Sequence, residues 1–100
     1  MNKKIKAKFE LFSAFKISGR GLVLGGHILE GHISNGDWIE FLINNQSLRR
    51  KIKSVEDVRS SDPEKFNTGL LIVCDSEEEI EMICNAQLKH ITALIYNADI

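Results

Sequence analysis

The densest group of chemically capable side chains is a basic run that consists of Arg49, Arg50, Lys51 and Lys53. Lysine and arginine neutralise phosphate groups, so such a run can bind a nucleic-acid backbone with an affinity that falls as salt rises. The alternative is that these residues form the solvated face of a strand or loop, as most charge runs do. The sequence leaves both interpretations open.

Residues 19–26 are rich in glycine, and at first sight this segment resembles a phosphate-binding loop. Such loops present backbone N–H groups at the start of a helix. Here Leu22-Val23-Leu24 favours a strand, and no Lys-Ser or Lys-Thr pair follows to complete a nucleotide-binding motif. The glycines therefore predict turns and barrel corners, and no GTP binding is expected.

The remaining reactive side chains lack a supporting pattern. His27, His32 and His90 do not have the spacing of zinc ligands, and ten residues separate Cys74 from Cys84. No nucleophile motif of the Gly-x-Ser-x-Gly kind occurs. We predict two reduced thiols, ordinary histidines, no metal, no cofactor and no catalytic activity.

Trp38 and Leu42 give the most useful lead to a binding surface. Strand alternation after the Asn35-Gly36 pair places Ile39 and Phe41 on one side of the backbone, and Trp38 and Leu42 on the other. If the first pair fills a core, an exposed tryptophan beside a leucine marks a surface that binds a partner. The equally weighted alternative is that residues 86–100 cover Trp38.

Short strands must position these side chains. Residues 5–11 alternate between apolar and charged, and the alternation breaks near residues 12–14, where a bulge is expected. Apolar residues on either side of Gly25-Gly26 belong to a strand pair or to one long strand kinked there. Asn35-Gly36 is the preferred dipeptide of a type I′ hairpin. Residues 49–59 favour a strand, although their apolar spacing of three suits a helix equally well.

The second half of the chain continues this pattern. Residues 70–74 are apolar on both faces and predict a central, covered strand. Ser76 followed by Glu79 predicts a capped helical turn near residues 76–83, and residues 88–96 predict a final strand. Many short strands separated by glycine-rich turns indicate an all-β sandwich or barrel. One hundred residues suit a single domain, 1–100.

Composition limits the class of protein. The chain is 43% hydrophobic and 27% charged, which is typical of soluble globular proteins. No apolar run approaches the roughly 18 residues that span a bilayer, so we expect a cytoplasmic protein without a membrane partner. The net charge is −1, with basic residues more frequent before residue 60 and acidic residues more frequent after it. A uniformly basic nucleic-acid binder is not indicated.

The run Phe15-Lys16-Ile17-Ser18-Gly19-Arg20-Gly21 resembles the second domain of translational GTPases of the elongation factor Tu type. The resemblance continues in order and spacing through Val23, Gly26, Gly31, Gly36-Asp37, Lys53-Ser54-Val55-Glu56 and Asn67-Thr68-Gly69-Leu70-Leu71. It implies a closed six-stranded antiparallel barrel of Greek-key type. It also implies that Phe15 and Arg20 lie near the position where the family binds the aminoacyl end of transfer RNA.

The chain also departs from this family. It has no Gly-x-x-x-x-Gly-Lys-Ser/Thr loop, and Glu81-Met82-Ile83 stands where the family has Glu-Arg-Gly. We therefore expect a non-enzymatic module that binds a protein partner through the face near Trp38 and Leu42 and through the turn that contains Arg20. The alternative is an RNA-binding module that uses the basic residues Arg20, Arg49, Arg50, Lys51 and Lys53.

Overall fold

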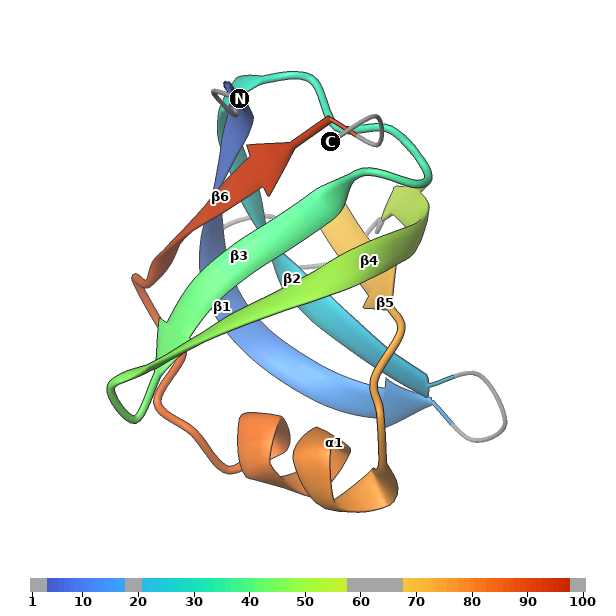
Figure 1. Ribbon diagram of the computed structural model, residues 1–100, viewed down its shortest axis with the longest axis vertical. Coiled ribbons are helices and arrows are strands. Elements are labelled where there is room, and N and C mark those ends of the chain that lie inside the picture. Colours follow the sequence, from blue (N-terminus) through green and yellow to red (C-terminus); the bar gives the residue numbers. More distant parts are fainter. Residues whose placement is uncertain (1–3, 18–20, 58–67, 98–100) are drawn as a thin grey trace.

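The protein is an all-β, closed six-stranded antiparallel barrel with one short helix (Figure 1). The computed structural model describes residues 4–17, 21–57 and 68–97, so Arg20 lies outside the described residues. The elements in chain order are β1 (Ile5–Ile17), β2 (Gly21–Gly31), β3 (Trp38–Ile43), β4 (Gln46–Asp57), β5 (Thr68–Ile72), α1 (Glu77–Cys84) and β6 (Thr92–Tyr96). Around the barrel the strands follow the order β1-β2-β5-β4-β3-β6, and β6 closes it by pairing with β1.

The core fills the interior of the barrel because each strand turns alternate side chains inward. The predicted alternation in β1 is confirmed from Ala7 onward: Ala7, Phe9 and Leu11 are buried between partly exposed neighbours, whereas Ile5 is exposed. In β3 the inward set is Ile39, Phe41 and Ile43. In β5, residues 69–72 are all buried, which confirms a covered strand. The predicted extension to residue 74 is wrong, because the strand ends at Ile72 and Val73 is exposed.

Two irregularities in the strands explain breaks in the sequence pattern. The register between β1 and β2 shifts between Leu11 and Ser13, which confirms the predicted bulge. The register between β4 and β5 shifts between Ile52 and Ser54. This second shift turns both Ile52 and Val55 toward the core despite their spacing of three, so the strand interpretation of this segment is correct.

Residues 21–31 form one long strand rather than a pair, and Gly26 lies where it crosses β1. A Cβ atom placed on Gly26 would lie 2.0 Å from the Glu10 carbonyl oxygen. Only glycine permits so close an approach of the two backbones.

The predicted Asn35-Gly36 hairpin is wrong, because β2 and β3 are not neighbours in the barrel. Gly36 does adopt a left-handed turn, with φ of 91°. The turn belongs to a connection that crosses to β4, where the Gly36 N–H donates to the Ile52 carbonyl. The two-residue hairpin lies between β3 and β4 instead, where Asn44 and Asn45 have φ of 50° and 65°, as a type I′ turn requires.

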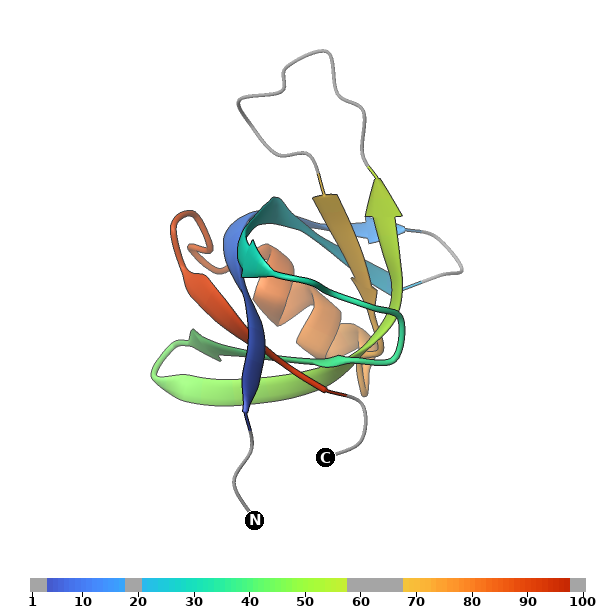
Figure 2. The same ribbon diagram turned by 90° about the horizontal axis from the view of Figure 1, so that it is seen from above.

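The helix α1 lies across one end of the barrel, below it in Figure 1 and within its outline in Figure 2. The Ser76 hydroxyl accepts a hydrogen bond from the Glu79 N–H, which confirms the predicted cap. The helix ends at Cys84 and exceeds the single turn that was predicted. It buries Ile80 and Ile83 against the barrel core. The final strand begins at Thr92, later than predicted.

Candidate binding surfaces

The predicted basic run is divided between the two sides of β4. Arg49 lies opposite Glu40, and Lys51 lies opposite Trp38, on the outer surface of the barrel. Arg50 lies opposite Ile39, whose side chain is fully buried in the core. Alternate residues of a strand face opposite sides, so Arg50 is turned away from the outer face that Arg49 and Lys51 share.

Arg50 joins β4 to α1 through Glu79. Its Nε donates to one carboxylate oxygen of Glu79 at 2.6 Å, and its terminal nitrogen donates to the other oxygen. The hydrogen bond from Arg50 holds the pKa of Glu79 below its usual value, and the same bond raises the pKa of Arg50. The guanidinium of Arg50 is therefore engaged inside the molecule.

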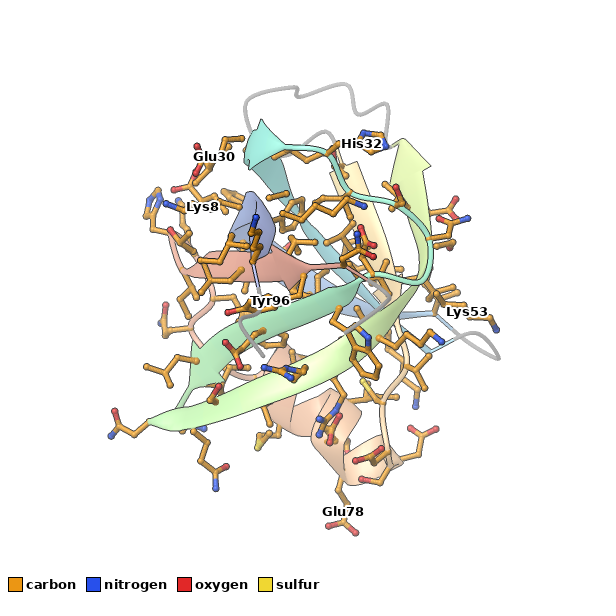
Figure 3. The ribbon with its side chains drawn as sticks, turned by 45° about the horizontal axis from the view of Figure 1, so that its top comes forward. Lys8, Glu30, His32, Lys53, Glu78 and Tyr96 are labelled. Carbon is orange, nitrogen blue, oxygen red and sulfur yellow. The ribbon has the colours of Figure 1, made fainter. Side chains whose placement is uncertain are left out.

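Arg49 belongs to a separate cluster on the outer face. Its guanidinium contacts the Glu40 carboxylate at 3.2 Å and lies 5.3 Å from the centre of the Tyr96 ring. The Tyr96 hydroxyl donates to the other Glu40 oxygen at 3.2 Å, and Figure 3 shows Tyr96 beside β3. Burial, followed by the nearby Glu40 charge, raises the pKa of Tyr96. The cluster neutralises Glu40 at the middle of the β3 face.

Lys51 and Lys53 are exposed, and neither forms an ion pair with another described residue. Figure 3 shows Lys53 extending outward from β4. Of the four predicted basic residues that the structure describes, these two keep their charge available for a ligand.

Trp38 and Leu42 share the outer side of β3, as predicted from the alternation. Trp38 is half-buried, with Tyr96 as its neighbour on β6 and Lys51 on β4. Leu42 is 56% exposed and lies opposite Ser47. The two apolar side chains are separated along the strand by the neutralised Glu40.

Leu42 stands at the edge of a pocket of about 390 Å³ between the β3–β4 hairpin and the end of α1. Ile43, Met82, Ala86 and Ile91 supply its apolar wall. The residues of the wall beyond β3 lie more than thirty positions away in sequence, so no local pattern could have indicated this pocket.

Phe15 lies on the outer side of β1 opposite Val23 and is 37% exposed. Next to it, Lys16 and Lys53 border a second pocket of about 300 Å³, whose walls include Ile17 and Ile72. The Lys16 ammonium contacts the Glu77 carboxylate at 2.7 Å, which raises the pKa of Lys16. The structure therefore brings Lys53 near the Phe15 segment, far from Leu42.

The sequence did not indicate a buried ion pair between Lys6 and Asp37. The Asp37 side chain is 3% exposed, and one of its oxygens accepts from the Lys6 ammonium at 2.6 Å and from the Ser34 N–H at 2.8 Å. This pair fixes the connection from β2 to β3 against β1. Its position and the two hydrogen bonds that this Asp37 oxygen accepts give it a structural role.

The structure shows how the possible metal ligands and the two cysteines are placed in the described part of the chain. Among residues 4–17, 21–57 and 68–97, no three His, Cys, Asp or Glu side chains are grouped as metal ligands would be. Cys74 and Cys84 are free, half-buried thiols. Burial raises the pKa of Cys74 to about 12 and also raises the pKa of Cys84, which disfavours the reactive thiolate.

In the part of the chain that the structure describes, no helix has the length and apolar character that crossing a bilayer requires. Comparison with protein-family models finds no match to this chain. Comparison with curated proteins likewise finds no relative.

Proposed function

We propose that the protein is a non-enzymatic module that binds a protein partner through the outer face of β3. The observation that carries this proposal is the exposure of Leu42, 56%, at the edge of a pocket that has one apolar wall. A large apolar side chain beside a concave apolar wall is typical of the centre of a protein interface. Half-buried Trp38 extends the same face, and Arg49 neutralises the carboxylate between them.

The resemblance to the second domain of translational GTPases supports the same class of function. The closed six-stranded antiparallel barrel is compatible with that domain. In that family the domain acts by packing against other domains and by contacting transfer RNA. We therefore propose a binding role related to that of a translation-factor barrel, in a cytoplasmic setting.

The test is co-purification with the doubly substituted chain Trp38→Ala, Leu42→Ser as bait. We expect this variant to lose partners that the unsubstituted chain retains, while its circular dichroism spectrum stays unchanged. Ser47→Ala, on the neighbouring strand of the same face, is the matched control and should retain them. Identical partners for a folded double variant would contradict the proposal.

RNA binding is the second candidate, and the pocket between Lys16 and Lys53 is the observation that favours it. The pocket adjoins the Phe15 segment that, by resemblance, lies near the aminoacyl end of transfer RNA. Arg49 and Arg50 form ion pairs with Glu40 and Glu79, so we propose that Lys51 and Lys53 are the residues that contact phosphate. Affinity for a short single-stranded RNA should fall steeply between about 50 and 200 mM salt if this candidate is correct. A flat response, or no binding at 50 mM salt, would eliminate it.

A further inference from the structure

We infer that the pocket beside Leu42 receives an apolar side chain of an extended peptide segment that carries lysine or arginine next to that side chain. The inference rests on the proposed function, since it names the chemistry of the partner at the same face. Three features of the pocket support it: an apolar wall, an uncharged rim of carboxamides, and two unpaired carboxylates along the adjoining helix.

The apolar wall has the size of an anchor site. Ile43 and Ile91 come from strand and loop positions that pack into the core, and Met82 and Ala86 come from α1 and the turn after it. The volume of about 390 Å³ lies near the lower end of the roughly 300–1,000 Å³ typical of ligand pockets. A single large side chain with its own backbone fits this volume better than an extended cofactor does.

The rim consists of three carboxamide side chains, Asn44, Asn85 and Gln87. Each carries both donors and an acceptor, which is the same set of groups that a peptide bond presents. Within the described residues, none of the three side chains has a hydrogen-bond partner. Such a rim matches the main chain of an extended peptide, and no charged group of the pocket lining matches a phosphate or a carboxylate ligand.

The helix beside the pocket supplies negative charge. Glu78 lies four residues before Met82, so its carboxylate lies on the side of α1 that lines the pocket. Glu81 lies four residues before Asn85 but also four residues after Glu77, so it stands between the pocket and Lys16, on which its charge acts. Figure 3 shows Glu78 extending into solvent from α1. Neither residue forms an ion pair with another described residue, whereas Glu77 and Glu79 on the same helix are neutralised.

The end of α1 adds to this negative potential. The C-terminal turn of a helix carries a partial negative charge, and the last turn of α1 contains no basic residue. Lys89, in the loop that follows, lies over the ring of Phe12, 5.1 Å from its centre. A lysine or arginine of the partner next to the apolar anchor would be attracted by Glu78 and by the helix end, whereas an acidic neighbour would be repelled by them.

The experiment selects peptides from a random twelve-residue phage library on the full chain. We expect enriched sequences to share leucine, isoleucine, methionine or phenylalanine with lysine or arginine within two positions. A synthetic consensus peptide is then titrated by fluorescence polarisation against three folded variants. Ala86→Leu, which fills the pocket, should weaken binding more than tenfold. Glu78→Gln with Glu81→Gln should weaken it about threefold to tenfold, and Glu77→Gln should leave it unchanged.

Several results would overturn the inference. Selection of acidic or purely polar peptides would contradict the assigned chemistry, and so would the absence of any enriched motif. If the folded Ala86→Leu variant binds the consensus peptide with unchanged affinity, the peptide does not bind in this pocket. Concentration-dependent dimerisation that Ala86→Leu abolishes would assign the pocket to a second copy of the chain. If Leu42→Ser abolishes co-purification but Ala86→Leu does not, the proposed function stands and the pocket assignment fails.

Discussion

Arg50 of β4 and Glu79 of α1 form a two-pronged ion pair that fastens the helix across the end of the barrel. The two side chains are 19% and 12% exposed, so the pair is largely shielded from water. Asp75, just before the helix, lies 3.5 Å from the same guanidinium. Planar guanidinium groups suit such bidentate contacts, which fix geometry as well as charge.

Replacing Arg50 with methionine should destabilise the protein by about 3 kcal/mol, because it leaves the shielded Glu79 carboxylate without its counter-ion. Urea unfolding at neutral pH measures the change. Arg49→Met is the matched control, and it should cost about 1 kcal/mol or less because its pair with Glu40 is more exposed. Equal costs for the two variants would contradict the assigned role of Arg50.

Glu79 should also contribute an acid-dependent part of the stability. Its pKa is lowered in the folded protein, mainly by the hydrogen bond from Arg50, while an unfolded chain returns it to about 4.3. The contribution is therefore complete above about pH 4.3 and is lost as the pH falls through the folded value.

Urea titrations of the unsubstituted chain and of Glu79→Gln between pH 6 and pH 3 test this dependence. We expect the difference in unfolding free energy to be largest at pH 6 and to shrink on acidification. Glu78→Gln, which removes an exposed negative charge of the same helix that has no ion pair among the described residues, is the matched control. A constant difference for Glu79→Gln would show that its ionisation is not coupled to folding.

Cys74 should react slowly with alkylating reagents. Burial raises its pKa to about 12, so almost none of it is thiolate at pH 8. In a Cys84→Ser background we expect iodoacetamide to modify Cys74 more than about tenfold more slowly than it modifies free glutathione. Mass spectrometry follows the reaction, and the same chain in urea provides the control. Equal rates in the folded and unfolded chains would contradict the burial of this thiol.

Gly26→Ala should prevent the normal crossing of β1 and β2, because the added Cβ would lie 2.0 Å from the backbone oxygen of Glu10. We expect a loss of more than about 3 kcal/mol, or failure to fold, since backbone cannot yield as a flexible side chain does. Gly21→Ala is the comparison: among the described residues its Cβ would meet Ile72 O at 3.5 Å, an ordinary contact, so we expect a cost of about 1–2 kcal/mol that comes from φ of 115°. A smaller effect at Gly26 than at Gly21 would contradict the close crossing.

The strands could be predicted from the sequence because their signals are local, but these signals fit a sandwich as well as a barrel. The closed six-stranded barrel was expected only from the family resemblance. Alternation in residues 5–11 and 38–43 places side chains inside or outside without knowledge of the partner strand. The break after Leu11 likewise indicated a bulge before any register was known.

The hairpin position could not be predicted because two candidate turns compete. Asn35-Gly36 has the stronger local preference, yet the Asn35 side chain accepts from the Val55 N–H and the Gly36 N–H donates to Ile52. These contacts, about twenty residues away, hold the turn in a crossing connection. Asn44-Asn45 then forms the hairpin with a weaker preference.

The candidate surface was predictable in part. The outward position of Leu42 followed from alternation, and the same rule, applied to the run from Arg49 to Lys51, indicates that Arg50 faces the other way. The acceptor for Arg50 and the pocket wall around Met82 come from distant segments. Only the closed barrel brings them together.

The pairing of β1 with β6 has a consequence for how the protein is made. The barrel closes only when Thr92–Tyr96 can join β1, which precedes the other strands of the barrel along the chain. Because this contact spans nearly the whole described chain, its loop-closure entropy is large and folding is expected to be slow compared with helical proteins. During translation the inner apolar faces of β1 and β2 therefore stay open to solvent until β6 leaves the ribosome, and in this interval the chain is most prone to aggregate.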